Sequence, residues 1–153
     1  MLAVLLISTF AATAQQALPA EVRAACDMAF AIVQKTPGIK TRRSSGTFRE
    51  EMFRAPVEGC RIDVNGSFKK AKTSGAPADN LFQGLDSRGW IELPDYSSDG
   101  HDGTSFAMRK TSVACFVRGE WDGGADDEPE IPPADPYKVT VICGTASQFV
   151  RPE

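Results

Sequence analysis

Residues 137–143 read YKVTVIC, and the rest of the predicted fold follows from the strand that they form. Apolar side chains recur at every second position from Tyr137 to Cys143, a period typical of a β-strand with one face in the core. The segment from Val113 to Trp121 has the same period. We expect the two to pair antiparallel, because a slip of one residue would turn every valine to the wrong side. The register that aligns them places Cys115 opposite Cys143, Val117 opposite Val141, Gly119 opposite Val139 and Trp121 opposite Tyr137.

The remaining segments predict an α+β fold with a single antiparallel sheet of about five strands. Helical spacing predicts an N-terminal helix at 19–35 and a second, short helix at 77–89, both packed on one face of the sheet, although Gly84 disfavours the second. Strands are expected at 47–54 and 60–68, with a basic turn at 40–46. A hairpin should pair Met108 with Val113 and Phe106 with Cys115.

The four cysteines, Cys26, Cys60, Cys115 and Cys143, are expected to form two disulfides. No C-x-x-C spacing occurs, so the sequence does not favour a zinc or redox motif. Four cysteines allow three pairings. The strand alignment favours Cys115–Cys143, which leaves Cys26–Cys60 to connect the first helix to the sheet.

The N-terminus indicates export. Residues 2–14 are apolar or small and end in the A-x-A signal Ala12-Thr13-Ala14, so we expect a signal peptide at 1–14 and a secreted or periplasmic protein. The apolar run is too short to span a bilayer. A single domain at 19–149 should remain. With a net charge of −3 and a sequence pI of about 5.2, nucleic acid is not the expected partner.

Residues 121–137, WDGGADDEPEIPPADPY, carry six acidic residues. The strand alignment makes residues 122–136 the tip of a long hairpin. Acidic oxygens bind calcium when several converge, and Asp122, Asp126 and Asp127 are the candidates here. The spacing does not match an EF-hand, and a solvated loop explains the same composition.

A second polar loop, SSDGHDGTS at 97–105, holds the only histidine, His101, between Asp99 and Asp102. A histidine beside a carboxylate can act as a general base, with Ser105 nearby, or join a metal site. Ordinary turn chemistry also explains this composition. The predicted sheet places residue 104 opposite Val117, so this loop should adjoin the acidic tip, and this shared edge is the argument for a joint calcium site as an alternative.

The sequence therefore predicts a non-catalytic exported domain that binds an unknown protein or envelope ligand through surface loops. Trp121, Tyr137 and His101 are the candidate binding residues. One alternative is a calcium-binding module that uses the acidic loops, and calcium is the only cofactor that the residues suggest. The other alternative is a small hydrolase that uses His101.

Overall fold

A computed structural model describes residues 17–53, 55–67, 77–100, 102–122 and 134–149. The elements, in chain order, are α1 (Ala20–Val33), β1 (Lys40–Phe48), β2 (Val57–Gly66), α2 (Pro77–Asp86), β3 (Ile91–Glu92), the 3₁₀ helix η1 (Pro94–Tyr96), β4 (Ser98–Gly100), β5 (Gly103–Lys110), β6 (Val113–Asp122), β7 (Ala134–Thr145) and the 3₁₀ helix η2 (Ala146–Phe149).

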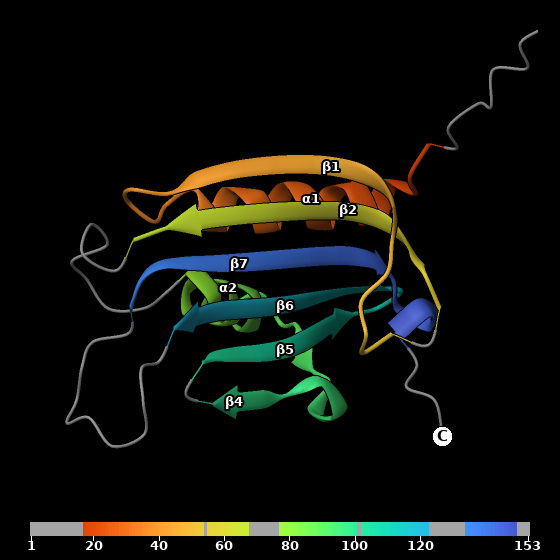
Figure 1. The fold of residues 1–153 in the computed structure, drawn as a ribbon. Coiled ribbons are helices and arrows are strands. Elements are labelled where there is room, and N and C mark those ends of the chain that lie inside the picture. The colour runs from red at the N-terminus through yellow and green to blue at the C-terminus, as the bar shows by residue number, and fades with distance from the viewer. Residues whose placement is uncertain (1–16, 54, 68–76, 101, 123–133, 150–153) are drawn as a thin grey trace, which may run out of the picture.

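The described strands form one antiparallel sheet with the order β1-β2-β7-β6-β5-β3, and β4 also pairs with β5. Helices α1 and α2 lie side by side behind this sheet (Figure 1). The α+β prediction is confirmed, although the sheet has seven strands rather than about five. β7, which contains YKVTVIC, lies between β2 and β6, and residues of both its faces are buried.

The predicted register between β6 and β7 is confirmed over most of its length. Cys115 pairs with Cys143 and Val117 with Val141. The register then shifts between Glu120 and Asp122, so that Asp122 pairs with Ala134 and the ladder does not pair Trp121 with Tyr137. β6 ends at Asp122 and β7 begins at Ala134. The segment between them is therefore 123–133, shorter than the predicted tip, and it lies outside the described residues.

The predicted register between β5 and β6 is wrong by two residues. Met108 pairs with Cys115 rather than Val113, because the hairpin closes with Lys110 opposite Val113. The two-residue turn is tighter than the predicted loop and places Thr111 at a φ of 53°. The apolar faces still agree, because a shift of two residues preserves the side on which each side chain lies.

The basic segment at 40–46 is not a turn. Together with Thr47 and Phe48 it forms β1, which pairs with β2 along its whole length. The predicted strand at 47–54 overlaps β1 only at its first two residues. β1 is an edge strand in which no residue is buried, so it lacks the alternation of apolar residues that marks a half-buried strand.

Both helices form close to the predicted ranges. The first disulfide, Cys26–Cys60, connects α1 to β2. Gly84 lies in α2 where α1 approaches, and a Cβ on Gly84 would lie 2.9 Å from Cδ1 of Ile32. The glycine that disfavours a helix in the sequence therefore permits the close packing of α2 against α1. Gly89, at a φ of 75°, follows the helix.

The sheet has apolar contacts on both faces. The larger cluster lies between the helices and the sheet and contains Cys60, Ile62 and Val64 from β2. A smaller cluster lies on the opposite face, where Phe116 and Ile142 pack beneath Phe53, Tyr96 and Phe149. Tyr96 Oη donates a hydrogen bond to the carbonyl of Phe149 at 2.6 Å, which joins η1 to η2. The sequence pattern predicted only the helix-covered face.

Candidate binding site at the strand ends

The face of the sheet opposite the helices carries a network of ion pairs beyond the smaller apolar cluster. Glu50 is at its centre: its carboxylate lies 3.6 Å from Nη1 of Arg61 and 3.8 Å from Nη1 of Arg118. Arg61 also donates from Nε to Asp63 at 2.8 Å, and Nη2 of Arg118 lies 3.0 Å from Glu120. The Glu50 side chain is only 15% exposed. Arg118 therefore lies between two carboxylates.

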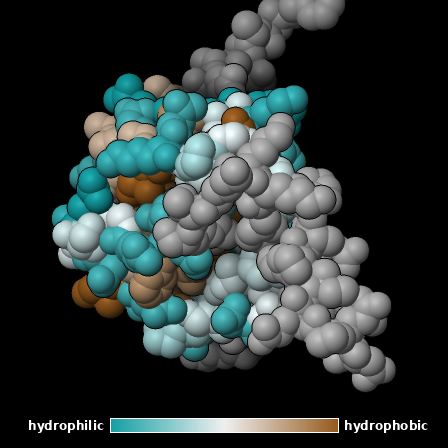
Figure 2. Space-filling view, turned by 90° about the vertical axis from the view of Figure 1, so that its left-hand side faces the viewer, coloured by the Kyte–Doolittle hydropathy of each residue, from teal (hydrophilic) through white to brown (hydrophobic). Residues whose placement is uncertain are grey.

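Arg118 and Glu120 line a cleft of about 810 Å³. The cleft lies at the end of the sheet where β5 begins and β6 ends. Its lining combines charges, hydroxyls, glycines and one aromatic side chain. The lining residues are Glu51, Met52, Ser98, Asp102, Gly103, Thr104, Ser105, Arg118, Gly119, Glu120 and Trp121. Figure 2 faces this end of the molecule, where hydrophilic residues dominate the coloured surface and hydrophobic patches are scattered.

The described ends of the two polar loops named in the sequence are neighbours at this end of the sheet. Gly103 pairs with Glu120, and the backbone N–H of Trp121 donates to the carbonyl of Asp102 at 3.0 Å. β4 and the start of β5 form a small ladder that replaces most of the expected loop at 97–105. The predicted proximity of this segment to the start of the acidic tip is confirmed for the residues that the structure describes, with Thr104 opposite Gly119 rather than Val117.

The candidate metal residues do not form a described cluster. Asp102 lines the large cleft, whereas Asp99 lines a separate cleft of about 290 Å³ with Asp79, Phe82 and Glu92. Across the residues with described side chains, no three carboxylates converge closely enough to hold an ion. Asp126, Asp127 and His101 lie outside the described residues, as does the side chain of Asp122.

The candidate binding residues Trp121 and Tyr137 lie in different environments. Trp121 is half-buried, packs against the larger apolar cluster and also lines the cleft. Tyr137 is only 1% exposed and is part of that cluster. A Cβ on Gly66 would lie 2.4 Å from the Tyr137 ring, which shows how closely the ring covers the backbone of β2. Tyr137 is therefore part of the core in this structure, and its binding role stays a prediction.

Ser105 is the hydroxyl that the hydrolase alternative requires. Its Oγ donates to the carbonyl of Tyr96 at 3.1 Å and therefore binds β5 to η1 in this structure. The side chain lines both clefts. A nucleophilic role would require this hydrogen bond to break.

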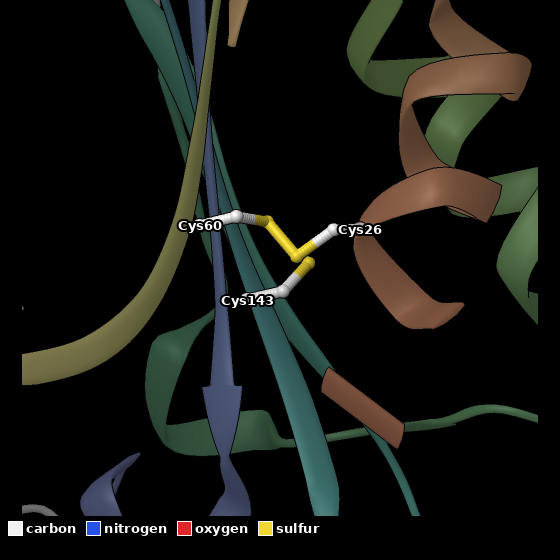
Figure 3. A group of neighbouring side chains, drawn as sticks. All are labelled: Cys26, Cys60 and Cys143. Carbon is white, nitrogen blue, oxygen red and sulfur yellow. A yellow bond between two sulfur atoms is a disulfide. The ribbon is translucent and has the colours of Figure 1, made fainter. Parts of the chain in front are cut away.

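All four cysteines are fully buried and form Cys26–Cys60 and Cys115–Cys143, the two predicted pairs. Figure 3 shows the Cys26–Cys60 bond beside the sulfur of Cys143. None of the helices in the described part of the chain is long and apolar enough to cross a membrane.

Comparison with known proteins adds no family to these observations: no family model, curated protein or solved structure matches this chain.

The sequence did not predict that Glu50, Arg61 and Arg118 form one polar surface. The alternation in β2 places Arg61 and Asp63 on the face opposite Cys60 and Ile62, which is a detectable signal. Glu50 lies in the connection between β1 and β2, and the sequence pattern did not show that this connection returns over the sheet.

Proposed function

We propose that this chain is a non-catalytic, exported domain that binds a protein or another ligand of the cell envelope through the cleft at the strand ends. The observation that supports it most directly is the position of Arg118 between Glu50 and Glu120 at the margin of that cleft. A guanidinium oriented in advance loses less side-chain freedom when it binds a ligand. Trp121 adds an amphipathic ring, a residue type that is frequent at binding surfaces.

Export is the second part of this proposal. It is supported by the A-x-A signal at 12–14 and by the two buried disulfides, which persist in oxidising compartments. Mass analysis of the protein from the medium or periplasm should give a chain that begins at Gln15. Retention of residues 1–14 in a soluble intracellular protein would contradict export.

Site-specific crosslinking tests the binding surface. A photoreactive residue at Glu51, which is exposed and lines the large cleft but not the smaller one, should capture one discrete partner from the native envelope. The same residue at Arg109, which is exposed on β5 outside the cleft, is the control. Capture should be lost when Arg118→Glu is added. Equal capture from both positions, or capture that Arg118→Glu does not change, would argue against this site.

Calcium binding is the second candidate function, favoured by the hydrogen bond between Trp121 and Asp102. This bond places the backbone of Trp121, the neighbour of Asp122 in the chain, beside Asp102 in the segment that also carries Asp99. Carboxylates from both loops would supply the hard oxygen ligands that calcium prefers.

A further inference from the structure

The two edges of the sheet differ. At one edge, β5 pairs with the short strands β3 and β4. At the other edge lies β1, which is nine residues long. In the part of the chain that the structure describes, no strand pairs with the outer side of β1 (Figure 1). Because alternate N–H and C=O groups of an edge strand point away from its neighbour, β1 offers a row of hydrogen-bonding groups to another chain.

The positive charge of β1 favours an acidic strand as its pairing partner. Its sequence, KTRRSSGTF, contains Lys40, Arg42 and Arg43 and no acidic residue. A second copy of β1 would bring like charges together, which opposes self-association. An acidic strand would instead gain favourable pairs. The Arg42 side chain is 82% exposed, so most of its surface is available despite a contact with Asp63 at 3.8 Å.

A groove beside β1 has room for side chains of such a strand. It has a volume of about 540 Å³ and lies between β1 and the start of α1. Leu18 gives it an apolar wall, and its charged lining residues are Arg23, Arg43 and Glu58, of which Arg43 pairs with Asp27 at 2.5 Å. Arg43 lies opposite Ile62, whose side chain is in the helix-side cluster, so the groove is on the helix side of β1. Arg42, opposite Asp63, is on the other side.

We propose that β1 is a docking edge for an extended acidic segment of a partner protein, which adds to the sheet as a further strand. Main-chain hydrogen bonds to β1 provide the affinity. Side chains of the added strand alternate between the two sides of the sheet. Acidic residues on one side contact Arg42, and apolar residues on the other side pack against Leu18 in the groove. This surface is separate from the cleft at Arg118 and does not depend on that cleft binding a ligand.

Peptide titration of the ¹⁵N-labelled, oxidised protein tests the proposal. The probe is a short peptide in which glutamate alternates with valine. It should shift the amide resonances of 40–48 and slow hydrogen exchange at alternate residues of β1. A matched peptide with lysine in place of glutamate should not bind. A third peptide keeps the glutamates but replaces the central valine with proline, which lacks a backbone N–H. It should bind about tenfold more weakly if ladder hydrogen bonds carry the affinity.

Variants locate the site. Arg42→Glu should weaken binding of the acidic peptide by about tenfold, since it reverses one exposed charge at the edge. Arg109→Glu makes the same change in an exposed strand residue of β5 and should leave the affinity unchanged. The ¹⁵N spectrum of each variant confirms its fold. Equal weakening by the two variants, equal binding of the proline peptide, or shifts confined to the Arg118 cleft would each overturn strand addition at β1.

Discussion

Cys60 and Cys143 lie directly opposite each other on β2 and β7, yet each is bonded to a different cysteine. Cys115 is in turn opposite Cys143 on β6, so three cysteines form one row across three neighbouring strands. The sulfurs of Cys26, Cys60 and Cys143 all lie within 4.8 Å of one another (Figure 3). The bond from Cys60 to Cys26 on α1 keeps Cys60 from pairing with Cys143, which is bonded to Cys115 instead.

Replacing Cys26 with serine should redirect the second disulfide. The freed Cys60 thiolate would attack Sγ of Cys143, forming Cys60–Cys143 and releasing Cys115 as the thiolate. Mass mapping after alkylation should find both linkages, with the alkyl group divided between Cys60 and Cys115. Alkylation of Cys60 alone would contradict exchange. The double variant Cys26→Ser/Cys60→Ser is the control: it should retain only Cys115–Cys143 and lose about 2–4 kcal/mol of stability.

Glu50→Gln should destabilise the protein by about 1–2 kcal/mol, because it removes the largely buried carboxylate between Arg61 and Arg118 while retaining its shape. Urea unfolding followed by circular dichroism measures the change. The neighbouring Glu51→Gln is the matched control. Glu51 is exposed, so its replacement should change stability by less than about 0.5 kcal/mol. Equal effects of the two substitutions would show that the network does not stabilise the sheet.

Gly84→Ala should destabilise the protein although alanine favours a helix by about 1 kcal/mol over glycine. The added Cβ would lie 2.9 Å from Cδ1 of Ile32 and 3.1 Å from its Cγ2, so either the Ile32 side chain or α2 must shift. Ile32→Val removes Cδ1 and should relieve part of the conflict. A double-mutant cycle measured by thermal unfolding should give a coupling of about 0.5–1 kcal/mol. If the effects of the two substitutions on stability are additive, the destabilisation by the alanine does not come from its contact with Ile32.

Local alternation was enough to predict the centre of the sheet. The period of two in 113–121 and 137–143 fixed both the faces and the register, and the cysteine pairing followed from it. β1 was missed because an edge strand with no buried residue has no apolar period to detect. The second apolar cluster was missed because it joins Phe53, Phe116 and Phe149 from distant parts of the chain.

The candidate site was predicted only in part, for a related reason. The sequence indicated that the polar loops meet, because strand pairing determines which strand ends are neighbours. It did not show that Tyr137 is buried, since an aromatic residue next to a hairpin tip can point to either side of the sheet. It also did not place Glu50 over the sheet, since that contact depends on the path of the connection between β1 and β2.

Calcium should raise the melting temperature of the mature protein if the two polar loops share an ion, because an ion that binds only the folded state stabilises it. At one hundred times the dissociation constant, the gain is about 2.7 kcal/mol. The paired variant Asp102→Asn/Asp122→Asn should abolish the shift by removing one carboxylate from each loop. Asp95→Asn, an exposed aspartate of η1 outside both clefts, should preserve it. Differential scanning calorimetry with calcium, with magnesium and with a chelator makes the comparison. No shift at millimolar calcium would exclude the joint site at useful affinity, whereas an equal shift in all variants would indicate binding elsewhere.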